Sequence, residues 1–203
     1  MTMDTLSIQR YENLSLSPLN DQVGVETILE LVLETGEILR QPCTAIHLEE
    51  LIAGILFSRS HVSSSDPAPF SKMDYERLLA AFKSFGDASP LFRKTGSVHS
   101  GQLLDENFEV LFFTEDMGRH NVMDKLIGFG VIHEIRLQDC LVMISSRMPL
   151  ELTEIALHAG ITRIASISAP TREAVLYARK NKMNLIGMFR GSRFNVYAGE
   201  EEE

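Results

Sequence analysis

The sequence predicts an α/β protein, with a small N-terminal unit followed by a larger domain built on a mixed, mainly parallel sheet. Beyond residue 110, short apolar segments alternate with segments whose apolar residues recur every three or four positions. This alternation is typical of strands separated by helices, as in βαβ units. A polar, Pro- and Ser-containing segment over 60–71 predicts a linker, so we divide the chain into units 1–70 and 71–203.

The N-terminal unit is predicted to contain a hairpin and a helix. Residues 1–20 are polar and lack periodicity, so we expect them to be poorly ordered. Two apolar, alternating runs over 23–40 flank Thr35–Gly36 and predict two strands joined by a turn. The run "HLEELIAGILFSR" then predicts a short helix, because its apolar residues share one face.

The second unit begins with an amphipathic segment, "KMDYERLLAAFKSF", for which we predict a helix with Gly86 as its C′ residue. A hairpin is expected around Asp105–Asn107, followed by a helix over 121–130. The remaining predicted elements are strand "CLVMIS", helix "LELTEIALHAG", strand "TRIASIS", helix "TREAVLYARKNK", strand "NLIGMF" and strand "FNVYA".

Composition excludes several classes of protein. The net charge of −9 argues against general nucleic-acid binding, and no apolar run approaches the ~20 residues that span a bilayer. The N-terminus has no basic segment followed by an apolar one, so we expect no signal peptide and a cytoplasmic location. Two distant cysteines, Cys43 and Cys140, form no CxxC pair, and the histidines show no zinc-binding spacing, so no metal site is predicted.

Polar residues follow four predicted strands in succession, in the segments "TEDMGRHN", "SSRMP", "SAPT" and "FRGSR". If these strands are parallel, all four segments lie at one edge of the sheet, where ligands of open α/β sheets bind. Helix N-termini at this edge favour anions, and the guanidinium of arginine matches phosphate and carboxylate. The four arginines are Arg119, Arg147, Arg190 and Arg193. We therefore predict a crevice for a phosphate-rich small molecule.

A purely structural interpretation of the same residues stays open. Asp116 and Arg119 could form a local ion pair, and Asn121 could cap the next helix together with Asp124. His99, in "TGSVHSG", is more often a satisfied polar contact than a catalyst when taken alone. The convergence of four segments favours a ligand site for the cluster as a whole.

Several of these segments resemble one known family. The runs "EDMGRHNVMDKLIG", "SSRMPLELTEIALHAGI", "ASISAPTREAVLYAR" and "LIGMFRGSRFNVYAG" resemble the FdhD sulfurtransferases, the formate dehydrogenase accessory proteins. "TGSVHSG" and "LEELIAGILFS" resemble two further segments of that family. The resemblance covers roughly 25–198, and the order of the C-terminal motifs is specific.

This resemblance implies a cytidine deaminase-like, three-layer α/β fold for the second unit. It implies an activity in which sulfur passes from a cysteine desulfurase, as a persulfide, to the molybdenum (or tungsten) bis-guanine-dinucleotide cofactor of formate dehydrogenase. The desulfurase and the formate dehydrogenase apoenzyme are the implied partners, and a homodimer is the implied assembly. The family's guanine-nucleotide loop corresponds to Met188, Phe189, Arg190, Gly191, Ser192 and Arg193. Asp116, Arg119, His120 and Arg147 are added as candidates for the same crevice, and a role of His120 as a proton donor is left open.

The chain departs from the family at the sulfur carrier. The family's carrier cysteines lie in a loop for which this sequence has "SSSDPAPFSK", with Ser65 and Ala68 at the matching positions. A hydroxyl cannot form a persulfide, because that chemistry requires a thiolate. Cys43 lies outside this loop and is retained only as a weak candidate for a catalytic, exposed thiol. Zinc deaminase chemistry is excluded because the HxE and PCxxC ligand motifs are absent.

Two functions therefore remain open, and with them whether the chain is an enzyme. The first is sulfuration or delivery of the molybdenum cofactor. The alternative is a non-catalytic protein that binds the cofactor or a guanine nucleotide and has lost sulfurtransferase activity.

Overall fold

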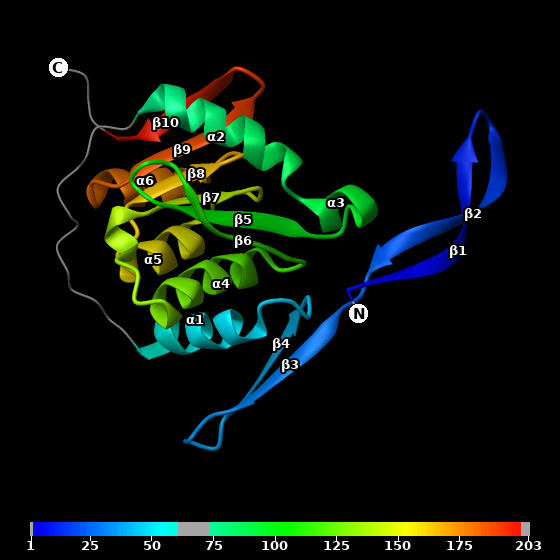
Figure 1. Cartoon of the computed structure of the whole chain (residues 1–203), viewed down its shortest axis with the longest axis horizontal. Helices are drawn as coiled ribbons and strands as arrows, with labels where there is room; N and C mark the ends of the chain where they lie inside the picture. The colour runs from blue at the N-terminus through cyan, green and yellow to red at the C-terminus, as the bar shows by residue number, and fades with distance from the viewer. Residues whose placement is uncertain (1, 61–73, 200–203) are drawn as a thin grey trace.

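A mixed six-stranded sheet forms the centre of the protein (Figure 1). The computed structural model describes residues 2–60 and 74–199. The sheet has the strand order β10-β9-β8-β7-β5-β6. Its strands are β5 (His99–Leu104), β6 (Val110–Asp116), β7 (Leu141–Ile144), β8 (Arg163–Ser166), β9 (Asn184–Arg190) and β10 (Arg193–Ala198).

Four of the six strands run in the same direction. Strand β5 pairs antiparallel with both β6 and β7, and β7, β8 and β9 pair in parallel. Strands β6 to β9 therefore all end at one edge of the sheet, as predicted. Because β5 lies between β6 and β7, the end of β6 is separated from the other three by the start of β5.

Helices cover both faces of the sheet and make three layers. Helices α4 (Arg119–Ile132), α5 (Leu150–His158) and α6 (Arg172–Lys180) pack on one face over side chains such as Val142 and Ile164. Helix α2 (Tyr75–Asp87) covers the other face, over Met143 and Ala165. Successive strand residues point to opposite faces, so each strand supplies both cores. The mixed α/β class predicted from the sequence is confirmed.

Helix α1 (Leu48–Ser60) lies outside α4 and forms an additional layer (Figure 1). Two glycines allow this close packing. A Cβ atom at Gly54 would lie 1.9 Å from the backbone oxygen of Asp124, and one at Gly128 would lie 1.8 Å from that of Glu50. The backbones of the two helices therefore touch directly where any side chain would prevent it.

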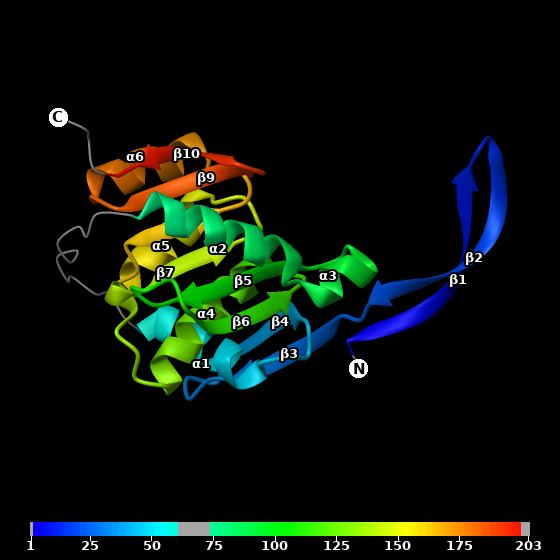
Figure 2. The same ribbon diagram turned by 45° about the horizontal axis from the view of Figure 1, so that its top comes forward.

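The N-terminal segment forms two hairpins. Strands β1 (Met3–Glu12) and β2 (Ser15–Gly24) pair in register and extend away from the body of the protein (Figure 2). The expectation that residues 1–20 would be poorly ordered is thus wrong. Asn13 and Leu14 have φ of 51° and 62°, which is the geometry of a two-residue type I′ turn and matches the twist of a hairpin. Strands β3 (Thr27–Val32) and β4 (Ile38–Cys43) form the second hairpin, as predicted.

The remaining predicted elements are confirmed, with three differences. Helix α2 continues through Gly86 and ends at a cap formed by Ala88, so Gly86 is not the C′ residue. A short helix, α3 (Pro90–Thr95), follows where no element was predicted, and a 3₁₀ turn spans Leu137–Asp139. In the described part of the chain, no helix is long and apolar enough to cross a membrane.

Candidate functional site

The loops that follow β7, β8 and β9 are bound to one another at the sheet edge. The Ser168 hydroxyl donates to the carbonyl of Ser145 at 3.1 Å, and the Met188 amide donates to the carbonyl of Ser168, also at 3.1 Å. The Ser145 amide in turn donates to the carbonyl of Ser100, at the start of β5. The ends of β7, β8 and β9 and the start of β5 are therefore joined by hydrogen bonds at this edge.

A cavity of about 440 Å³ opens at this edge, on the face covered by α2. Its walls come from the end of α2, from α3, from the segment 96–100 and from the loops after β7 and β8. Phe85, Phe92 and Ile167 make parts of the lining apolar, whereas Ser145 and His99 contribute polar groups. An apolar cavity with a few convergent polar groups is the usual form of a small-molecule site.

His99 has a more specific place than the sequence suggested. It lines the cavity, and its side chain makes no hydrogen bond to another residue of the described chain. Burial lowers the pKa of the imidazole, and the nearby Arg119 guanidinium lowers it further, against an opposing effect of Asp116. The neutral form of the ring is therefore favoured, and this form has one donor and one acceptor nitrogen.

Two of the four predicted arginines are exposed at the edge without an ion pair to any residue the structure describes. These are Arg147, after β7, and Arg193, at the start of β10. Arg190 is also exposed, but its guanidinium donates to the carbonyls of Ile167 and Phe189 at 3.1 and 2.6 Å. Arg119 is half-buried, and its Nε atom is buried with no hydrogen-bond partner in the described chain.

The segment 188–193, which comprises the end of β9 and the turn into β10, connects this edge to the core under α2. Phe189 stacks on Phe82 of α2 with a centroid distance of 4.6 Å and an interplanar angle of 8°. Gly191 has a φ of 63°, a conformation that glycine adopts without strain, and Ser192 beside it is exposed. Met188 also has a positive φ, of 57°. Whether these six residues bind a guanine nucleotide stays a prediction.

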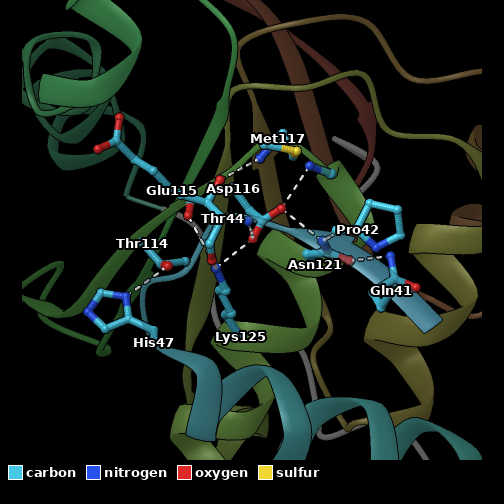
Figure 3. Close-up of polar contacts among 11 residues, drawn as sticks. Gln41, Pro42, Thr44, His47, Thr114, Glu115, Asp116, Met117, Asn121 and Lys125 are labelled. Atoms are coloured by element: carbon cyan, nitrogen blue, oxygen red, sulfur yellow. Dashed lines mark hydrogen bonds and ion pairs between the residues drawn. The ribbon is translucent and has the colours of Figure 1, made fainter. Parts of the chain in front are cut away.

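Asp116 lies at the centre of a buried polar network instead of facing the cavity (Figure 3). One carboxylate oxygen accepts from Lys125 Nζ at 2.6 Å and from the Thr44 amide at 3.0 Å. The other accepts from the Gly118 amide at 2.9 Å and from Asn121 Nδ2 at 2.8 Å. Asp116 and Lys125 are both fully buried, so the carboxylate has its donors from the protein and serves to position the edge.

Asn121 extends the network to the β3–β4 hairpin. Its amide nitrogen also donates to the carbonyl of Pro42 at 2.7 Å, and its oxygen accepts from Gln41 Nε2 at 2.7 Å. The alternative interpretations of this segment are therefore wrong in detail. Asp116 pairs with Lys125 rather than with Arg119, and Gly118, not Asn121, is the N-cap of α4.

Glu115, the neighbour of Asp116, caps a helix. Its carboxylate accepts from the Ser89 hydroxyl at 2.5 Å and from the amides of Leu91 and Phe92 at 3.1 Å. These amides belong to the first turn of α3, where a negative charge is favourable. The two carboxylates at the end of β6 thus organise the walls of the edge, and both are used within the protein.

The remaining candidates, His120 and Cys43, lie away from the cavity. His120 Nε2 lies 3.2 Å from a carboxylate oxygen of Glu151, at the start of α5. Cys43 was retained as the one candidate for an exposed thiol, but it is fully buried, and burial raises its pKa. Cys140 is 2% exposed, and burial raises its pKa to about 11. Neither thiol has the access and thiolate character that sulfur transfer requires.

The predicted positions of the missing carrier cysteines, Ser65 and Ala68, lie outside the described residues. Within the described residues, no three His, Cys, Asp or Glu side chains are placed to hold a metal ion. Three residues of the buried network, Lys125, Thr44 and Gln41, were not among the predicted site residues. Lys125 could have been found, because a lysine in an otherwise apolar helical stretch requires a buried partner.

Comparison with known proteins identifies the family. A sequence model of the FdhD/NarQ family matches residues 61–202. "Sulfur carrier protein FdhD" of Bacillus subtilis is 26% identical over 249 residues, covering 96% of this chain and 95% of that protein. The protein of the same name from Corynebacterium efficiens is 42% identical over 128 residues, which cover 63% of this chain and 46% of the relative.

The fold has also been seen before. A crystal structure of a formate dehydrogenase accessory protein from Desulfotalea psychrophila superposes with a TM-score of 0.86. The superposition covers 98% of both chains at 20% sequence identity, and so shows that the two proteins share a fold. The family match over most of the chain leads to one conclusion: this chain belongs to the FdhD/NarQ family.

Proposed function

We propose that this protein binds the guanine-dinucleotide form of the molybdenum cofactor at the sheet edge and serves its delivery to formate dehydrogenase, without carrying the sulfur itself. Two observations together carry this proposal: both cysteines are buried, and the sheet edge is open and bears exposed arginines. The relatives are named sulfur carrier proteins, and this chain retains their motifs around the edge but has no accessible thiol in its described part.

The edge suits a phosphate-rich ligand on physical grounds. Helices α4, α5 and α6 all begin there, so their free amides and positive dipole ends point toward it. Arg147 and Arg193 supply guanidinium groups that no described acidic residue neutralises. The cavity at the same edge, which neither arginine lines, offers apolar walls for a flat ring system, with His99 and Ser145 as hydrogen-bonding groups.

Sulfur transfer by the chain itself is the second candidate. It is favoured by the family match and by the names of the relatives. On this alternative, a cysteine desulfurase would load a persulfide on a thiol of this chain, and burial of Cys43 and Cys140 would have to be relieved first. A homodimer, and contact with the desulfurase and the formate dehydrogenase apoenzyme, are part of the proposal by family membership.

Two assays on the same purified protein test the proposal. GDP is titrated by calorimetry into the wild type, into Arg193→Ala, and into Arg136→Ala as a matched control. Arg136 is an exposed arginine paired with Asp139, before β7 and therefore at the opposite edge of the sheet. We expect Arg193→Ala to weaken GDP binding about tenfold or more, as loss of a hydrogen bond to a charged group does, and Arg136→Ala to leave it unchanged.

The second assay tests whether a cysteine of this protein can be loaded with a persulfide sulfur. The protein is incubated with a cysteine desulfurase, cysteine and pyridoxal phosphate, and its intact mass is measured, with Cys43→Ser as control and the Bacillus subtilis relative as positive control. GDP binding without an added sulfur atom supports the proposal. A persulfide on either cysteine overturns its second half, and absence of GDP binding overturns the first.

A further inference from the structure

A second pocket, of about 270 Å³, lies on the opposite side of the protein from the α2 cavity. It is enclosed by the β3–β4 hairpin and by helices α1, α4 and α5. Four aliphatic side chains line it, namely Leu31, Leu39, Ile55 and Ile155. None of the residues that line the α2 cavity takes part in it.

One carboxyl group stands in this apolar wall. Asp124, on α4, lines the pocket, and one of its oxygens accepts a hydrogen bond from the Ser58 hydroxyl at 3.3 Å. No lysine, arginine or histidine pairs with Asp124 anywhere in residues 2–60 and 74–199. A partly buried carboxylate without a counter-ion is unfavourable, so an incoming cation would stabilise the ionised form of Asp124.

The rim of the pocket is already neutralised. Arg40 pairs with Glu30 at 2.8 Å, Arg59 pairs with Glu37 at 3.3 Å, and His120 contacts Glu151. These three basic residues line the pocket, but their partners are exposed acidic residues rather than Asp124. Asp124 is therefore the ionisable group of this pocket that has no ion-pair partner in the described chain.

We propose that this pocket receives a lysine or arginine side chain of a partner protein, with the cationic group on Asp124 and the methylene stem along the four aliphatic side chains. Long basic side chains bury their stems on apolar surface and place the charge at a polar group beyond it, which is the arrangement this pocket offers. The protein's net charge of −9 also favours a basic partner surface.

The proposal predicts a particular pH dependence. Burial raises the pKa of Asp124 from its ordinary value of 3.8 to about 7, and the Ser58 hydrogen bond opposes this shift. Since the cation requires the ionised carboxylate, binding should strengthen as the pH rises from 6 to 8.

The test uses the full chain with ¹³C-labelled Ile and Leu methyl groups and two probes, Nα-acetyl-lysine N-methylamide and its arginine counterpart. Saturable shifts of methyl groups in the pocket are expected with at least one probe, stronger at pH 8 than at pH 6. Asp124→Asn, which keeps an oxygen for Ser58 and should fold, is expected to weaken binding about tenfold or more. Ser58→Ala keeps the carboxyl and should retain binding.

Three results would overturn the proposal. The first is equal binding of the Nε-acetylated lysine probe, or retained binding by Asp124→Asn, since either would show that charge is not recognised. The second is binding of free lysine without binding of the capped residue, which would indicate a small-molecule site. The third is absence of any shift up to the solubility limit of both capped probes.

Discussion

Replacing Asp116 with Asn tests the idea that the buried network holds the β3–β4 hairpin to the central sheet. The substitution keeps the size of the side chain but removes the charge opposite Lys125, which is fully buried. Lys125 would retain only the carbonyls of Thr44 and Glu115, at 3.3 and 3.4 Å. In addition, the new amide group would direct its hydrogens at groups that are themselves donors, either Lys125 and Thr44 or Gly118 and Asn121.

Removal of one partner from a buried ion pair costs about 3–5 kcal/mol, because it leaves the other charge uncompensated. A domain of ordinary stability has about 5–15 kcal/mol in total, so this loss is a large fraction of it. With a urea slope of about 2 kcal/mol per M, the unfolding midpoint of Asp116→Asn should fall by about 2 M.

The assay is equilibrium urea unfolding of Asp116→Asn, Lys125→Met and the double variant. We expect Lys125→Met to be milder, since Asp116 keeps three neutral donors, and the double variant to lose less than the sum of the two. Glu30→Gln is the matched control, because it breaks the exposed Arg40 pair of similar length and should change stability by less than about 1 kcal/mol. A loss below about 1 kcal/mol for Asp116→Asn, or strict additivity in the double variant, would refute the reasoning.

Three further predictions concern other parts of the protein. The stability of Asp124→Asn relative to wild type should increase by about 3 kcal/mol between pH 5 and pH 8, as measured by paired urea titrations. The reason is that the folded-state pKa of the Asp124 carboxyl is raised to about 7. Such a group contributes stability below its unfolded pKa, and the wild type loses that contribution as the pH rises through the folded pKa. Cys43 and Cys140 should not react with a thiol reagent in the native protein and should both react in denaturant; rapid native reaction of Cys43 would contradict its burial. Gly54→Ala should lower stability by at least about 1–3 kcal/mol in thermal unfolding, because the added methyl group would overlap the Asp124 backbone. An unchanged unfolding midpoint would argue against the close contact between α1 and α4.

The central sheet was predictable because its signals are local. Each strand from β7 to β9 is a short apolar run buried on both faces, and each following helix has its own apolar stripe. The convergence of the strand ends followed from this pattern once β6 was taken as parallel to β7. Only the insertion of β5 between them, which depends on pairing over distance, could not be derived.

The β1–β2 hairpin was missed for a physical reason. Its residues are exposed on both faces for most of their length, and the apolar residues that alternate with polar ones, such as Leu6 and Ile8, are too few to mark two ten-residue strands. The available signal was the turn, where Asn13 precedes Leu14 and both adopt positive φ.

The roles of the polar residues were harder to derive than the fold. Asp116 and Asn121 looked like ligand-binding or capping residues, and their main partners include Thr44 and Pro42, which are more than 70 positions away in sequence. Such contacts have no sequence spacing that identifies them. The Asp124 pocket could not be predicted from the sequence for the same reason, since its walls come from segments that only the tertiary structure brings together.

The network around Asp116 also determines when the protein can complete its fold during synthesis. Gln41 and Thr44 donate hydrogen bonds to residues that follow them by 80 and 72 positions, and the Pro42 carbonyl accepts one from a residue 79 positions later. At about 5–20 residues per second, the ribosome makes those later residues between about 4 and 16 seconds after the first. Throughout that interval α1 has no α4 to pack on, and its apolar face stays uncovered. The nascent chain is therefore most open to aggregation, and most in need of a chaperone, before α4 emerges.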